Sequence, residues 1–211
     1  MRNQTGKIKI MLSSTVYGFE SDLTTIVALL KRLGYDVLNS HMGTIKVYPS
    51  LSNLGNCLKA VEECDLFLGI IRPFYGSGNI GEQNIIVEEI KLAVENEKPC
   101  WFLVHRDVIV MRRFLKQFKL KDKATTLSGI VDKFKSLDCV EKFICDKNLD
   151  YRCVDVYNIV SRDSVDVKER KGNWVQPYYA PEEYMTFINT QFSDKNFIEE
   201  ILKMKEANDG K

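Results

Sequence analysis

The chain has 211 residues, of which 45% are hydrophobic and 28% charged, and its formal net charge at pH 7 is +1. This composition predicts a globular protein with a sizeable core, and the near-neutral charge argues against a nucleic-acid-binding protein, which would carry a basic surface. No apolar run is long enough to span a bilayer and no signal peptide is recognised, so we expect no membrane contact. The six cysteines form no Cys-x-x-Cys pair, which is typical of a reducing cytoplasm, and with two histidines we expect no metal site.

Short apolar runs alternate with amphipathic segments along the first half of the chain. The apolar runs predict four strands, at Lys7–Leu12, Tyr35–Leu38, Leu66–Ile71 and Pro99–Val104. Apolar residues at helical spacing predict four helices, at Glu20–Leu33, Leu51–Glu63, Ile85–Asn96 and Val108–Phe118. Strands that alternate with helices in this way form a parallel sheet, so we expect an α/β fold with a doubly wound, mostly parallel sheet of the flavodoxin type.

From about residue 119 the pattern changes, and we expect a mainly helical C-terminal extension. The prediction is an α/β domain at residues 1–118 and an extension at residues 119–211 that packs on it as one structural unit. Leu120–Asp146 has an interrupted helical pattern, whereas Tyr151–Val160 is rich in the strand formers Val, Ile and Tyr. Two helices are predicted near the end of the chain, at Pro181–Phe192 and from Asp194 to about Ala207.

The stretch Leu66–Ala93 carries the features of a binding site. Its strand is followed by a loop at Arg72–Gln83 with one proline and three glycines, and Asn84 is placed to cap the next helix. In an open parallel sheet, ligands bind outside the carboxyl ends of the strands, beside helix N-termini. We therefore expect the candidate site at this loop and at the first turns of the helix that follows.

An early acidic residue of this helix is the candidate catalytic group. Glu88 and Glu89 are adjacent, so their side chains point about 100° apart and at most one faces the crevice. Glu89 lies between Ile86 and Ala93 on the packed arc, and Glu88 lies further toward solvent. The positive end of the helix favours an ionised carboxylate, and an anion in a partly dry pocket stabilises positive charge that develops on a substrate. The spacing therefore selects Glu89.

Polar residues at the carboxyl ends of two other predicted strands are candidates for substrate binding. Ser13, Ser14 and Thr15 follow the first strand, and their hydroxyls either bind a ribose or phosphate or only cap the next turn. His105 follows the fourth strand on the side of the crevice, where it is placed to touch a substrate.

The loop after the third strand supplies further candidates. Arg72 is able to pair with a phosphate through two parallel hydrogen bonds. Tyr75 either stacks on a base or pyridine ring or, together with Gly76, only shapes the turn. Asn84 is a cap that also lies beside the expected crevice.

Five short motifs follow one another in a recognisable order. They are Ser-Ser-Thr after a strand (Ile10–Thr15), Asp-Leu in the first helix (Asp22–Leu23), Asp-Leu-Phe at the third strand (Asp65–Phe67), Tyr-Gly (Tyr75–Gly76), and Glu-aliphatic-x-x-Ala from Glu89. This order resembles the superfamily of TIR domains and nucleoside 2-deoxyribosyltransferases. It is most similar to a TIR-like family of unknown function that precedes STAND NTPase or repeat modules in larger proteins. The resemblance covers about residues 7–105, and the family usually has Ser where Asn84 stands.

The resemblance implies an enzyme that cleaves the N-glycosidic bond of a nucleotide without a cofactor. NAD is the favoured candidate substrate and a nucleoside is the second choice. Glu89 would stabilise or trap the oxocarbenium-like ribose that forms when the bond breaks. Ser13, Ser14 and Thr15 would border the ribose or phosphate, and Arg72 and Tyr75 would lie across the pocket.

The second hypothesis is a non-catalytic TIR-like module that self-associates or senses a nucleotide in an immune or antiphage pathway. The sequence has no G-x-x-x-x-G-K-[ST] motif of an NTPase, so such a module would act on another chain. Under either hypothesis we expect a small nucleotide as ligand, a homo-oligomer as the assembly and the cytoplasm as the location.

Overall fold

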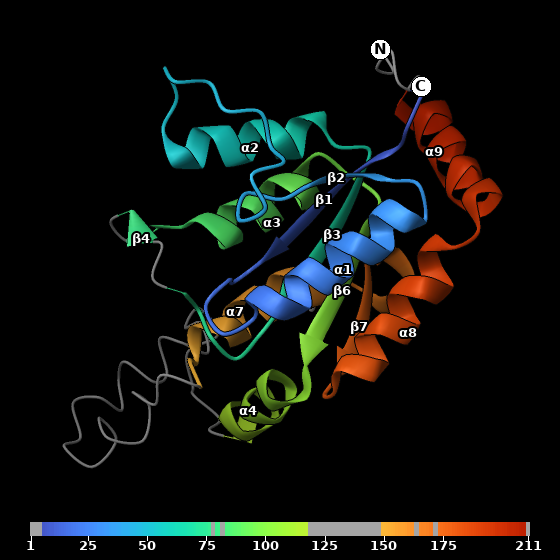
Figure 1. Cartoon of the computed structure of the whole chain (residues 1–211). Helices are drawn as coiled ribbons and strands as arrows, with labels where there is room; N and C mark the ends of the chain where they lie inside the picture. Colours follow the sequence, from blue (N-terminus) through green and yellow to red (C-terminus); the bar gives the residue numbers. More distant parts are fainter. Residues whose placement is uncertain are drawn as a thin grey trace.

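A computed structural model of the chain describes residues 6–76, 79–80, 83–117, 149–162, 165–170 and 173–209. The main sheet has the strand order β2-β1-β3-β6-β7, and each of its four pairings is parallel (Figure 1). Its strands are β1 (Lys9–Ser14), β2 (Asp36–Leu38), β3 (Leu66–Ile71), β6 (Cys100–His105) and β7 (Asn173–Tyr178). A separate antiparallel pair joins β4 (Asn79–Ile80) to β5 (Gln83–Asn84).

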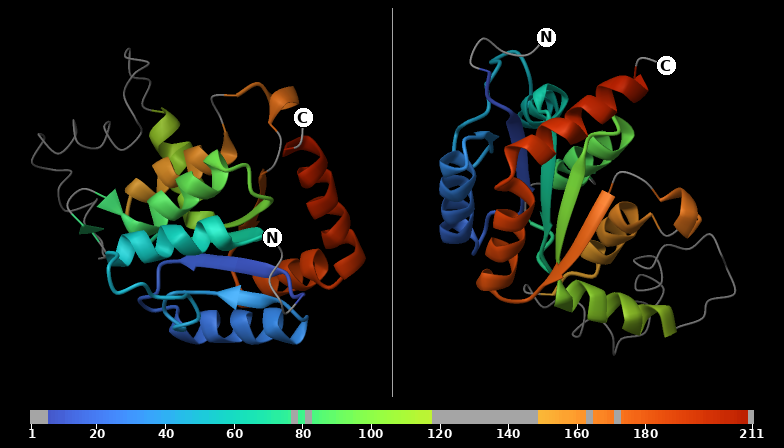
Figure 2. Two further views of the ribbon diagram at one scale, coloured as in Figure 1. Left: turned by 90° about the horizontal axis from the view of Figure 1, so that it is seen from above. Right: turned by 90° about the vertical axis from the view of Figure 1, so that its right-hand side faces the viewer.

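Helices cover both faces of the sheet, as Figure 2 shows. One layer is formed by α1 (Glu20–Arg32), α8 (Pro181–Phe192) and α9 (Lys195–Asp209). The other layer is formed by α2 (Asn53–Glu63), α3 (Ile85–Glu95), α7 (Arg152–Ser161) and, directly after β6, α4 (Arg106–Gln117). A short 3-10 helix lies at Val167–Glu169. This is the predicted doubly wound α/β fold with a helical C-terminal part. Among the described helices, none combines the length and the apolar character needed to cross a membrane.

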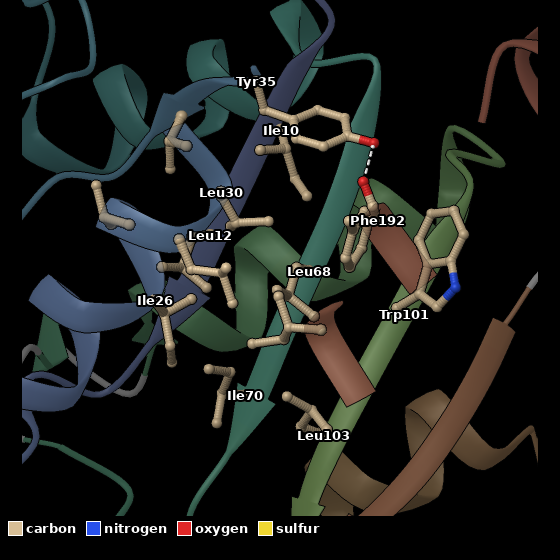
Figure 3. Close-up of a cluster of buried hydrophobic side chains, with 14 of the residues drawn as sticks. Ile10, Leu12, Ile26, Leu30, Tyr35, Leu68, Ile70, Trp101, Leu103 and Phe192 are labelled. Atoms are coloured by element: carbon tan, nitrogen blue, oxygen red, sulfur yellow. Dashed lines mark hydrogen bonds between the residues drawn. The ribbon is translucent and has the colours of Figure 1, made fainter. Parts of the chain in front are cut away.

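Alternation along the strands divides the core into two halves. In β1, Leu12 faces the layer of α1 and α8, whereas Met11 faces the layer of α2 and α3. Figure 3 shows the first half, in which aliphatic side chains of β1, β3 and β6 meet those of α1. The Tyr35 hydroxyl donates a hydrogen bond to the Phe192 carbonyl oxygen at 2.9 Å, and the Phe192 ring packs on Trp101. The end of α8 is therefore held in the same core as the first two strands.

The predicted strands and helices of the first half are present, and β1 ends later than predicted, at Ser14 instead of Leu12. The described part of the Arg72–Gln83 loop also contains the short strand β4 and the first residue of β5. The predicted helical pattern at Leu120–Asp146 lies outside the described residues.

The strand-like reading of Tyr151–Val160 is wrong, because this segment forms the helix α7. Its buried residues Cys153, Val154, Val156 and Val160 recur at helical spacing, and packing of that face overrides the strand preference of valine. The fifth strand, β7, was not predicted. Among the described strands it pairs with β6 alone, at the edge of the sheet, where a proline such as Pro177 is tolerated.

Candidate active site

A cavity of about 230 Å³ lies between the carboxyl end of β1 and the first turns of α3. Six of the residues selected from the sequence line it: Ser13, Ser14, Thr15, Gly76, Asn84 and Glu89. The rest of its wall consists of Leu12, Val16, Tyr17, Ser40, Phe74, Ile85 and Ile86. The position agrees with the rule that ligands of parallel sheets bind beyond the carboxyl ends of the strands.

Glu89 is the buried acid of this cavity. Only 3% of its surface is exposed, and its Oε2 accepts a hydrogen bond of 2.5 Å from the Ser13 hydroxyl. The Cys57 thiol, from α2, lies near the same carboxylate. Glu88 instead pairs with Lys91 at 2.8 Å on the outer side of α3. The helical spacing therefore predicted correctly that Glu89 faces the cavity and Glu88 the outer side of the helix.

Burial raises the pKa of Glu89 to about 7, and the neighbouring Ser13 hydroxyl and Cys57 thiol oppose this rise. Within the described ranges, no lysine, arginine or histidine pairs with this carboxylate. Near neutral pH the side chain is thus close to half ionised. In its ionised form the side chain carries a negative charge that no cationic partner neutralises among the described residues. Such a charge suits a ligand with a positive charge.

The end of β1 determines which hydroxyl reaches Glu89. Ser13 pairs with Gly69 and Ser14 with Ile70 in the neighbouring strand β3. Because successive side chains of a strand point to opposite faces, Ser13 faces α3 and Ser14 faces the layer of α1. The Ser14 hydroxyl donates to the Thr15 carbonyl oxygen at 3.2 Å. The two serines therefore have different surroundings, although both line the cavity.

Arg72 lies behind the loop that follows β1. Its Nη1 donates to the carbonyl oxygens of Thr15 at 3.2 Å and Tyr17 at 2.9 Å, and its Nη2 donates to that of Gly18 at 3.3 Å. The guanidinium also lies 4.7 Å from the centre of the Phe19 ring. Arg72 does not line the cavity. Its observed contacts position the loop that carries Thr15 and Tyr17.

Asn84 joins the helix α3 to the loop before it. Its Oδ1 accepts from the Ile86 N–H at 2.9 Å, so the predicted cap is confirmed, and its Nδ2 donates to the Tyr75 carbonyl oxygen at 2.5 Å. Gly76 has a φ of +87°, and a Cβ there would lie 3.1 Å from Thr15 Cγ2, so both the backbone and the space require glycine. The Tyr75 ring does not line the cavity, because it packs under Arg152, whose guanidinium lies 4.1 Å from its centre.

We expect Asn84→Ala to lower the free energy of unfolding by about 1–2 kcal/mol, because it removes the cap and a donor to a partly buried carbonyl oxygen. Urea denaturation measures this change. Asn84→Ser keeps an acceptor for the cap and should lose less than Asn84→Ala. Equal stability of Asn84→Ala and the parent protein would contradict the assigned role.

His105 lies outside the cavity, at the end of β6. Its ring packs between those of Tyr178 and Tyr179, with centroids 5.3 and 5.5 Å away, and its Nδ1 lies 3.3 Å from the Asp107 carboxylate. Burial lowers the pKa of His105. The described residues hold no group of three His, Cys, Asp or Glu side chains suited to a metal ion.

The cavity lies within a part of the chain that matches a known protein family. Residues 9–158 match the model of a family described as a domain of unknown function, DUF4062. The matched range covers most of the chain and includes every residue that lines the cavity. The chain belongs to the DUF4062 family. The comparison with curated proteins finds no match.

Two residues of this DUF4062 site were missed by the sequence analysis. Cys57 shares the buried face of α2 with Ala60 and Val61, but no sequence signal places it near Glu89. Tyr17 follows the Ser-Ser-Thr motif and packs on Phe74, with ring centroids 5.5 Å apart. Because Tyr17 is 75% exposed, this aromatic pair marks the open end of the cavity and Glu89 its closed end.

A larger hollow of about 680 Å³ lies at the amino ends of β6 and β7 in this DUF4062 chain. Its wall includes Trp101, Trp174 and Phe197. Its one described acid, Glu97, is exposed. Among the described residues this hollow has no buried carboxyl group, and it lies at the end of the sheet where ligands of parallel sheets do not usually bind.

Proposed function

We propose that this DUF4062 domain is a TIR-like N-glycosidase that cleaves NAD to nicotinamide and an ADP-ribose product, with Glu89 as the catalytic carboxylate. One observation carries the proposal. A buried acid at the closed end of the cavity accepts a hydrogen bond from a neutral hydroxyl and has no cationic partner among the described residues. An uncompensated buried charge destabilises a fold, and such groups cluster at functional sites.

The chemistry needs one anion and a leaving group that is already positively charged. When the bond between the ribose C1′ and the nicotinamide nitrogen breaks, its electron pair neutralises the pyridinium ring and leaves a cationic ribose. The Glu89 carboxylate stabilises that cation, or traps it through one oxygen, until water adds at C1′ and releases a proton. No acid is needed for the leaving group, so a histidine in the cavity is not required.

The size of the cavity supports binding of part of a dinucleotide. Its volume of about 230 Å³ is below the range of roughly 300–1,000 Å³ that encloses drug-sized ligands. The nicotinamide-ribose half is the part that must reach Glu89, and the adenine half would extend past the mouth. There Tyr17 and Phe74 offer aromatic faces on which a planar base is able to stack.

A non-catalytic module that senses a nucleotide through self-association is the second candidate. The exposed Tyr17 beside Phe74 favours it, because an aromatic pair at the mouth is also suited to a contact with another copy. In that case the cavity would bind a nucleotide without cleaving it.

We expect the purified chain to release nicotinamide from NAD and to release no reduced nicotinamide from NADH. The reduced ring is neutral and cannot leave by accepting the electron pair, so the redox state of the substrate tests the role of its charge. Nicotinamide is measured by chromatography over a series of protein concentrations, because self-association is part of the alternative. Absence of nicotinamide at every concentration would contradict the enzyme, and a change of sedimentation on adding NAD would then support the sensing module.

A further inference from the structure

The Ser13 hydroxyl and the Glu89 carboxylate meet at the closed end of the cavity. Ser13 Oγ donates to Glu89 Oε2 at 2.5 Å, and both side chains are buried. Both residues also line the cavity. Ser13 is on β1 and Glu89 on α3, so this bond joins the central sheet to the helix that carries the acid.

The two carboxylate oxygens of Glu89 have different surroundings. Oε2 accepts the bond from Ser13, whereas Oε1 accepts no hydrogen bond from the residues that the structure describes. Oε1 is also not among the enclosed polar atoms without a partner in the described part of the chain. An unbonded oxygen that is not enclosed is in contact with open space, and the space that Glu89 lines is the cavity.

The register of β1 determines that the hydroxyl of Ser13, and not that of Ser14, reaches the acid. Ser13 pairs with Gly69 of β3, and its side chain points toward α3. Ser14 points to the opposite face of the sheet, and its hydroxyl donates to the Thr15 carbonyl oxygen at 3.2 Å. The Ser13 proton is therefore given to Glu89 and is not available to a phosphate.

Within the described ranges, the charged side chains of the elements in contact with α3 pair with one another and not with Glu89. The pairs are Lys9 of β1 with Glu63 of α2 at 3.6 Å, Lys59 with Glu62 on α2 at 3.1 Å, Glu88 with Lys91 on α3 at 2.8 Å, and Arg152 of α7 with Asp150 at 2.6 Å. Glu95 of α3 is exposed, Asp155 of α7 is partly exposed, and β5 has no charged residue. The Cys57 thiol of α2 stays neutral at physiological pH, because burial and the neighbouring Glu89 raise its pKa to about 12.

We propose that Ser13 is a positioning residue that holds Glu89 Oε2 and thereby presents Oε1 to the cavity. The role of Oε1 as the oxygen that faces the ribose cation rests on the proposed function, whereas the hold on Oε2 does not. A hydrogen bond to one oxygen restricts rotation of the carboxylate and stabilises its ionised form. A neutral donor does this without a positive charge, which would repel a cationic substrate.

The test measures the ionisation of Glu89 directly, by carbon-13 NMR of the labelled glutamate carboxyls in the full chain without ligand. The Glu89 signal is the one lost in Glu89→Gln. We expect Ser13→Ala to raise its pKa by about one pH unit, as removal of one hydrogen bond to an anion does. Ser13→Thr keeps the hydroxyl on the strand and should return the titration toward that of the parent protein.

Ser14→Ala is the matched control, because it makes the same chemical change on the next residue of β1, which is also buried and also lines the cavity. It should leave the Glu89 titration unchanged, since its hydroxyl bonds elsewhere. Near-ultraviolet circular dichroism checks the fold of each variant. If Ser13→Ala does not fold, Ser13→Cys tests the proposal, because its thiol is a weaker donor and should raise the pKa of Glu89 by a smaller amount. A titration within about 0.2 pH units of the parent in Ser13→Ala, or an equal shift in Ser14→Ala, would overturn the proposal.

The outcomes separate the two proposals. A shifted titration without any cleavage of NAD refutes the proposed function and supports the hold of Ser13 on Glu89. Cleavage of NAD with an unchanged titration refutes the role of Ser13 alone.

When both proposals hold, Ser13→Ala should lower kcat by roughly 10–100-fold at a pH well above both pKa values, because the carboxylate is ionised but no longer oriented. The acidic limb of its pH–rate profile should move to higher pH by the same amount as the NMR titration. A rise in KM with kcat unchanged would mean that Ser13 binds the substrate instead, and would overturn the positioning role.

Discussion

Replacement of Glu89 by glutamine is expected to lower the rate of nicotinamide release from NAD by about 1,000-fold or more, since it removes the anion that faces the ribose cation. Glutamine has nearly the same shape, and its carbonyl oxygen is still able to accept the hydrogen bond from Ser13. The loss should therefore appear in kcat, with the fold intact by circular dichroism. Chromatographic assays of nicotinamide at saturating NAD measure it.

Glu88→Gln is the matched control, because it makes the same chemical change on the next residue of α3. Glu88 bonds to Lys91 near the surface, and loss of a partly exposed pair of this kind is worth about 1 kcal/mol. We expect its turnover to stay within about twofold of the parent protein, as for most surface substitutions. Equal turnover in Glu89→Gln and the parent would contradict the assignment of the carboxylate.

The local sequence pattern was sufficient to predict the strands and helices that surround the site. Leu66–Ile71 is buried at every position, so its apolar run had one reading, and the alternation of such runs with helices determined a parallel sheet. The predictions for the segments that form α7 and β7 were wrong or missing for the opposite reason. Their sequences combine strand formers and breakers, and only packing against the rest of the sheet decides between the two states.

The same distinction applies to the site. Helical spacing alone separated Glu89 from Glu88, because the direction of a side chain follows from its position on a regular helix. Which side-chain donors remain available to bind a ligand depends instead on the conformation of the loops. Arg72 was chosen for a phosphate, and the structure gives its donors to the carbonyl oxygens of its own neighbouring loop. The approach of Cys57 to Glu89 depends on how α2 packs on α3, which no local pattern encodes.

The free energy of unfolding should show the cost of keeping an acid in this cavity. The pKa of Glu89 is raised from 4.5 to about 7 in the folded protein, so the folded state binds the proton more tightly than the unfolded chain. This favourable contribution is complete below pH 4.5 and is lost as the pH rises through 7. Over that window the parent protein should lose roughly 3 kcal/mol through this group, at about 1.4 kcal/mol for each pH unit of difference.

Glu89→Gln carries no titrating group at this position, so its stability relative to the parent should increase from pH 4.5 to pH 8 by roughly 3 kcal/mol. Urea denaturation of both proteins at several pH values gives this difference, in which the titrations of His105 and all other groups cancel. A flat difference would mean that the carboxyl is not destabilised when it ionises. A positive slope, together with lost turnover, would show that the chain retains a charge that weakens its fold because that charge is needed for catalysis.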